Sequence, residues 1–148
     1  MSQTLTTESG HTVLLATFFV HDTLCALDAT GVEEVIRLGA LTRVRYAPDE
    51  VLGIVNLRGK IVTIVDLGAR IGFPKAVPGT DSRIFIIEDC NESIGLLVDR
   101  MDEVVEVERD HWQPPPANVN GAQARFFKGV CRVGGRVITL LDAGQILG

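Results

Sequence analysis

Apolar residues in this chain fall in short β-branched runs broken by tight polar turns, a pattern typical of strands. Thr12–Val20 and Leu24–Leu27 flank a polar turn, which predicts a hairpin. Arg83–Glu88 and Ser93–Asp99 predict a second hairpin. Asp102–Glu108 alternates acidic residues with valine and predicts a half-exposed strand. The chain is therefore expected to be mostly β.

The middle of the first half carries the clearest local signals. Ile54–Leu57 and Lys60–Val65 flank the turn Arg58-Gly59 and predict a hairpin whose second strand is buried on both faces. Asp66 then stands at an N-cap position for a short helix through Ile71. A short helix is also predicted within Ala47–Gly53, with Pro48 at its first position, whereas Val32–Ile36 fits a strand or a short helix equally well.

An internal repeat links the two halves of the chain. Gly53–Gly72 aligns with Gly129–Gly148 at an offset of 76, with six of twenty positions identical. A weaker echo relates the segment from Gly31 to Ile36 to the segment from Arg100 to Val105. We expect two similar β units, roughly residues 12–75 and 83–148, sharing one apolar core in a single domain, with strand exchange between them an open alternative.

Composition narrows the classes of function. The 148 residues carry 14 basic and 19 acidic side chains, a formal charge of 14 − 19 = −5, which argues against a nucleic-acid binder. The apolar content of 46% excludes a disordered chain. Runs of the roughly 18 apolar residues that a membrane span needs are missing from the sequence, so direct membrane insertion is not expected.

The sequence offers little catalytic or cofactor chemistry. Nucleotide-binding glycine loops, CxxC pairs and an HExxH helix are all missing, so neither a cofactor nor a metal is expected. The cysteines Cys25, Cys90 and Cys131 are expected to be small buried side chains. Asp66 and Asp142 occupy the same repeat position and could form the carboxylate pair of a two-lobed aspartyl hydrolase, but helix caps explain them more simply.

Arg58 stands out as a candidate for partner recognition. It occupies a tight turn where its repeat partner is Gly134, so the fold by itself does not require an arginine there. A long, forked donor on a rigid hairpin is well suited to engage another protein.

The run from Gly53 to Leu67, GIVNLRGKIVTIVDL, resembles the hallmark of the CheW family, in which a G-[VI]-x-N-x-R-G turn precedes an apolar strand ending in Asp-Leu. Similarity extends along nearly the whole chain, including Val32–Ile36 and the segment from Ile94 to Asp99. The resemblance implies two five-stranded SH3-like β barrels around a shared hydrophobic core. It also implies a non-catalytic, cytoplasmic adaptor recruited to membrane receptor arrays.

The partners implied by the resemblance are the cytoplasmic signalling tip of a chemoreceptor and the regulatory domain of a CheA-like histidine kinase. Pilus-related and surface-sensing pathways are an alternative setting, and a self-associating β protein is an alternative class. We expect a groove between the barrels, with Arg58 and Glu34 as polar guides. Matching motif positions give these partner-binding residues: Val32, Glu34, Gly53, Asn56, Arg58, Gly95 and Val104.

Overall fold

The computed structural model describes residues 12–89, 91–114 and 124–148. The prediction for Cys90 lies outside the described residues. The strands are β2 (Thr12–Val20), β3 (Thr23–Asp28), β4 (Val32–Arg37), β5 (Val51–Leu57), β6 (Lys60–Asp66), β7 (Arg83–Asp89), β8 (Glu92–Val98), β9 (Arg100–Glu108), β10 (Phe127–Val133) and β11 (Arg136–Leu141). The short helices are η2 (Ala29–Gly31), α1 (Leu67–Arg70), η3 (Arg109–His111) and α3 (Ala143–Leu147).

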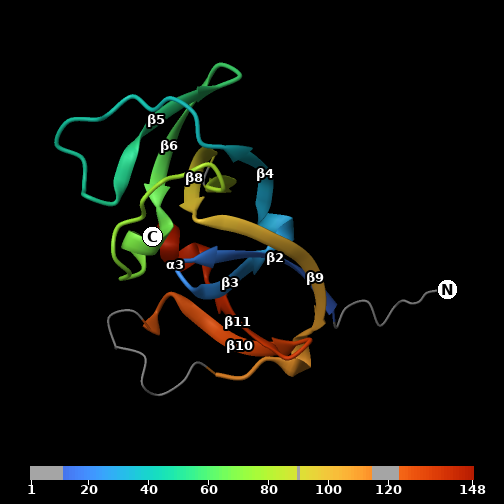
Figure 1. Ribbon diagram of the computed structural model, residues 1–148. Coiled ribbons are helices and arrows are strands. Elements are labelled where there is room, and N and C mark those ends of the chain that lie inside the picture. The colour runs from blue at the N-terminus through green and yellow to red at the C-terminus, as the bar shows by residue number, and fades with distance from the viewer. Residues whose placement is uncertain (1–11, 90, 115–123) are drawn as a thin grey trace.

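These strands form two five-stranded sheets, which confirms the predicted all-β class (Figure 1). The first sheet has the order β4-β7-β8-β6-β5 and the second has the order β9-β2-β3-β11-β10. Each sheet therefore joins a hairpin from one half of the chain to three strands of the other half. The sheets do not coincide with the sequential units 12–75 and 83–148, because the two halves exchange their leading hairpins.

The pairing register shows that the sequence repeat is also a structural repeat. Strand β6 lies parallel to β8 with Thr63 opposite Ile94, and β11 lies parallel to β3 with Thr139 opposite Cys25. Strands β4 and β9 also correspond, since each pairs antiparallel with the first strand of the exchanged hairpin and has a register shift there. The weaker sequence similarity is therefore also a structural repeat. The two sheets thus have equivalent strand pairing.

The apolar side chains gather in three clusters that explain this layering. The largest lies between the sheets and includes Phe18 and Phe85, whose rings meet edge to face at 5.0 Å. Each sheet also curls around a smaller cluster of its own, built on Val62 and Ile64 in the first sheet and on Leu15 and Ile138 in the second. The shared core therefore fixes how the two sheets sit together.

A close approach of two backbones joins the edges of the first sheet. After β4 the chain turns back, and Thr42 pairs with Ile54 of β5 through hydrogen bonds of 3.0 and 2.8 Å. Gly53 makes this approach feasible, because a Cβ there would lie 2.6 Å from the Thr42 carbonyl oxygen. The second sheet repeats the device at Gly129, where a Cβ would lie 2.6 Å from the Gln113 carbonyl oxygen.

Two local predictions for this region are wrong. The segment from Pro48 to Gly53 is not a helix: a single turn, closed by Val51 N donating to Pro48 O at 3.0 Å, leads directly into β5. Pairing with β6 outweighs the helix-start signals because it supplies a whole ladder of hydrogen bonds. Strand β6 is not buried on both faces either, since Ile61 is 61% exposed. Val32–Ile36, which fitted either structure, is strand.

Both predicted caps are confirmed. Asp66 accepts a hydrogen bond from Ala69 N at the start of α1, and Asp142 accepts one from Gln145 N at the start of α3. Asp66 also accepts from Ala76 N at 2.8 Å. Arg70 of α1 donates to the carbonyl oxygen of Ile146 at 2.9 Å, so the two repeat helices are tied together.

Candidate functional site

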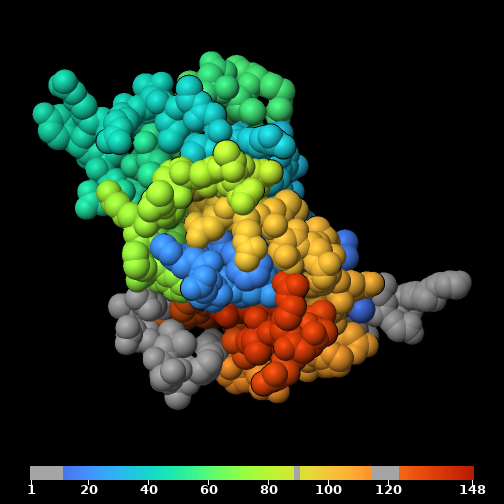
Figure 2. All heavy atoms as spheres, viewed as in Figure 1, coloured from blue at the N-terminus to red at the C-terminus, as the bar shows by residue number. Residues whose placement is uncertain are grey.

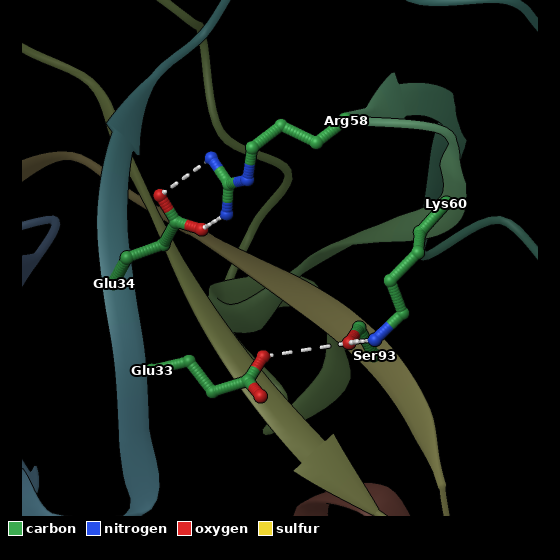
Figure 3. Close-up of polar contacts among 5 residues, drawn as sticks. All are labelled: Glu33, Glu34, Arg58, Lys60 and Ser93. Carbon is green, nitrogen blue, oxygen red and sulfur yellow. Dashed lines mark hydrogen bonds and ion pairs between the residues drawn. The ribbon is translucent and has the colours of Figure 1, made fainter.

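The candidate site begins with an irregularity in β4. Between Val32 and Glu34 the register with β7 shifts, so that Glu33 and Glu34 together oppose Ile86. Such a bulge re-aims side chains that would otherwise alternate between faces. The close-up view shows both glutamates extending from β4 toward the β5–β6 hairpin (Figure 3).

Arg58 reaches back to meet them from the turn of that hairpin. The turn has positive φ at both central residues, +52° at Arg58 and +85° at Gly59, as tight hairpins require. Asn56 stabilises it by accepting a hydrogen bond from Gly59 N at 2.9 Å. The Arg58 guanidinium then forms a two-pronged contact with the Glu34 carboxylate, with Nη1 at 3.4 Å from Oε2 and Nη2 bonded to Oε1.

A second polar contact crosses the same opening. Lys60 Nζ donates to Ser93 Oγ at 3.3 Å, and Ser93 Oγ donates to Glu33 Oε1 at 3.4 Å (Figure 3). These groups surround a hollow of about 320 Å³, here called the first mouth. Its lining residues are Glu33, Glu34, Leu57, Arg58, Lys60, Val62, Ile86 and Ser93.

The Glu34–Arg58 pair lies at the surface. The side chain of Arg58 is 70% exposed and that of Glu34 is 30% exposed. In the space-filling view, the green tip of the β5–β6 hairpin stands at the surface at the top of the molecule (Figure 2). The hydrogen bond from Arg58 lowers the pKa of Glu34, and the same bond raises the pKa of Arg58. The pair is therefore fully charged at neutral pH.

Stability does not account for Arg58. Exposed ion pairs contribute only about 0–1 kcal/mol. A residue with a side chain in the left-handed region costs about 1–2 kcal/mol compared with glycine. The equivalent turn of the second sheet uses Gly134 and Gly135 and folds the same way. Arg58 therefore occupies a position where glycine would serve the fold at least as well.

The structure separates the predicted partner-binding residues into two groups. Glu34 and Arg58 meet at the first mouth, and Asn56 supports the turn that carries Arg58. Gly53 and Gly95 are buried backbone positions, and a Cβ at Gly95 would lie 2.6 Å from Ile64 and Ile84 side-chain atoms.

Val32 and Val104 lie away from this cluster. Val32 packs against the core between the sheets. Val104 is 51% exposed on β9, a strand of the second sheet. A hollow lined by both sheets is present, and Val32 is among its lining residues. Glu34 and Arg58 are not part of it, because every residue lining the first mouth belongs to the first sheet or its hairpin turn.

Sequence reasoning missed Glu33, Lys60 and Ser93 as members of the first mouth. Glu33 and Lys60 are 27 residues apart in a region rich in charge, and Ser93 begins the second strand of the predicted second hairpin. The alignment of the repeat did contain one signal, since Lys60 corresponds to Arg136 and so preserves a cation. Only the long-range pairing of β6 with β8 brings Ser93 to Lys60.

Other chemistry finds no support in the described residues. Asp66 and Asp142 are each used as a helix cap. Clusters of three or more metal-ligating side chains were not found among residues 12–89, 91–114 and 124–148. Burial raises the pKa of the Cys25 thiol to about 12 and also raises that of Cys131, so neither is a ready nucleophile. Across the same residues, the helices are too short and polar to cross a membrane.

Comparisons with known proteins agree with this architecture. The family model of the CheW-like domain matches residues 15–148. The chain is 31% identical to the chemotaxis protein CheW of Rhizobium meliloti over 132 residues, which covers 89% of this chain and 85% of that protein. It is 30% identical to the chemotaxis protein CheW of Treponema pallidum over 136 residues, covering 89% and 80%.

A solved structure resembles the fold closely. The crystal structure of the scaffolding protein TtCheW from Thermoanaerobacter tengcongensis superposes with a TM-score of 0.80 at 32% sequence identity. The match covers 88% of each chain.

Proposed function

The chain belongs to the CheW-like domain family, and on that basis we propose that it is a non-catalytic adaptor coupling chemoreceptors to a CheA-like histidine autokinase. The proposed partners are the cytoplasmic signalling tip of a receptor and the regulatory domain of the kinase. The proposed location is the cytoplasm, at membrane receptor arrays. A CheW-like scaffold in a pilus-related or surface-sensing pathway would use the same surfaces with other partners.

One observation carries this proposal to particular residues. Arg58 takes a conformation that glycine would adopt at lower cost, and it presents a charged guanidinium at the surface. Arginine anchors of this kind contribute strongly at protein interfaces because their planar donors bind in fixed geometry. Glu34 holds the guanidinium in place, which reduces the entropy lost when a partner docks.

The test uses the kinase and the receptor tip from the same organism. The wild-type chain should form a ternary complex with both and raise kinase autophosphorylation. Arg58→Ala should weaken binding by about tenfold or more while leaving the unfolding curve nearly unchanged. Arg37→Ala is the matched control, because Arg37 is exposed on the same strand as Glu34.

A charge swap separates recognition from structure. The double variant Glu34→Arg/Arg58→Glu keeps an ion pair across the first mouth but reverses what the partner meets. If Arg58 recognises the partner, the swap should not restore binding. Recovery of wild-type affinity by the swap would show that the pair acts only on the fold, and absence of any complex with the wild-type chain would refute the adaptor proposal.

A further inference from the structure

The second sheet has a hollow that corresponds to the first mouth by the internal repeat. It has a volume of about 230 Å³ and is here called the second mouth. Its lining residues are Thr17, Glu103, Val105, Val133, Gly134, Arg136 and Ile138. The offset of 76 pairs Gly134 with Arg58, Arg136 with Lys60 and Ile138 with Val62.

The acidic residues at the two mouths also correspond. In β9 the register with β2 shifts between Ala16 and Phe18, so that two residues, Asp102 and Glu103, oppose the single residue Thr17. The bulge in β4 does the same with Glu33 and Glu34. Thr17 fixes the second bulge because its hydroxyl donates to the Glu103 carbonyl oxygen.

The charges at the two mouths differ by one cation. At the first mouth two carboxylates face Arg58 and Lys60, so the charges cancel. At the second mouth Asp102 is paired with Arg136 at 2.6 Å, which leaves the Glu103 carboxylate. Glu103 is exposed, and its carboxylate has no ion pair with any described residue. Arg100 also acts electrostatically on Asp102 and lies over the Phe19 ring, so Glu103 is the carboxylate at the second mouth that has no ion-pair partner in the described part of the chain.

The missing cation is the one that the hairpin turn supplies in the first sheet. Gly134 has φ of +59°, close to the +52° of Arg58, so the backbone of the two turns is alike. A Cβ built on Gly134 would meet no atom within 4 Å, so nothing crowds the position from which Arg58 extends in the first sheet.

We propose that the second mouth binds an arginine side chain presented by a partner protein, whose guanidinium pairs with Glu103 over Gly134 as Arg58 pairs with Glu34 within the chain. The aliphatic side chains of Val105 and Val133 line the opening and suit the methylene stem of an arginine. A divalent cation is a poorer fit, because calcium needs six to eight oxygen ligands and Arg136 already occupies Asp102.

The test needs neither the kinase nor the receptor, so it is independent of the proposed function. The isotope-labelled full chain is titrated at low salt with N-acetyl-Gly-Arg-Gly-amide and followed by nuclear magnetic resonance. Saturable shifts are expected at Glu103, Gly134 and Arg136, with a dissociation constant in the millimolar range. The same peptide with citrulline, which is neutral, is the matched probe and should give no saturable shift.

Variants decide whether the binding is at the second mouth. Glu103→Gln should weaken binding roughly tenfold, because it removes the charged acceptor. Gly134→Arg should abolish binding by filling the site from within, whereas Gly134→Asn tolerates the same backbone without a cation and should bind normally. Arg58→Gly should open the first mouth and create new saturable shifts at Glu34.

Two results would overturn the proposal: equal shifts from the arginine and citrulline peptides, or unchanged binding by Glu103→Gln. The binding measurement on Glu103→Gln remains decisive even if Gly134→Arg fails to fold, since Glu103 is an exposed position whose substitution should not affect folding.

Discussion

Replacing Gly53 by alanine tests whether this glycine closes the first sheet. The new Cβ would lie 2.6 Å from the Thr42 carbonyl oxygen, 3.2 Å from the Thr42 carbonyl carbon and 3.3 Å from Leu41 Cβ. The nearest atoms are backbone, so a side-chain rotation cannot relieve the contact. Gly53 also has φ of +155°, a conformation that residues with a Cβ rarely adopt.

The cost follows from what must move. Overpacking of this kind costs about 1–3 kcal/mol. Moving the Thr42 segment away would weaken the two hydrogen bonds with Ile54, each contributing about 0.5–1.5 kcal/mol. We therefore expect Gly53→Ala to lower the free energy of unfolding by about 2–4 kcal/mol, which for a chain of this size lowers Tm by roughly 5–15 °C.

Urea and thermal unfolding followed by circular dichroism measure this change, with Gly79→Ala as the control because a Cβ there meets no atom within 4 Å. Gly129→Ala should lose a similar amount, since its Cβ would lie 2.6 Å from the Gln113 carbonyl oxygen. The reasoning is refuted if Gly53→Ala unfolds like Gly79→Ala. Partner binding lost without loss of stability would instead make Gly53 a contact residue.

Other outcomes follow from the caps, the ion pair and the thiols. Asp66→Ala should lower the free energy of unfolding by about 1–2 kcal/mol in urea titrations, because the cap of α1 is lost; an unchanged midpoint would contradict the cap. Arg58 lowers the pKa of Glu34, so the pairing is complete above the ordinary glutamate pKa and is lost as pH falls through the lowered value. The carboxyl resonance of Glu34 should accordingly titrate at higher pH in Arg58→Ala than in the wild type, and equal midpoints would disprove the pairing. Cys25, with its pKa raised to about 12, should resist thiol reagents at pH 8 until the chain unfolds, and rapid labelling of the native chain would show that the site is open.

Local signals predicted local structure well. Turn residues between short β-branched apolar runs located the hairpins, and the position of Asp66 after an apolar run predicted its cap. The repeat at an offset of 76 predicted that hairpin, cap and helix occur twice. The hairpins, cap and short helix each depend on residues a few positions apart, so the information for each lies within a short window of sequence.

The same local signals gave wrong predictions at Pro48 and Ile61. Helix-start chemistry around Pro48 was outweighed by pairing with β6, and the apolar run from Ile61 did not reveal that this side chain faces solvent. Both outcomes depend on a neighbouring strand rather than on the segment itself. Alternation of apolar and polar residues along a strand does not specify which strand will pair with it.

The residue pattern alone predicted most of the strands and turns, the duplication, and the unusual arginine at a turn where the other copy has glycine. The tertiary structure decided that the two halves exchange hairpins, and it brought Glu34 to Arg58 across 24 residues and Ser93 to Lys60 across 33. The physical reason is that pairing between distant strands is selected by burial of the shared core. The positions of charged groups around each mouth are a consequence of that burial, not of the local sequence.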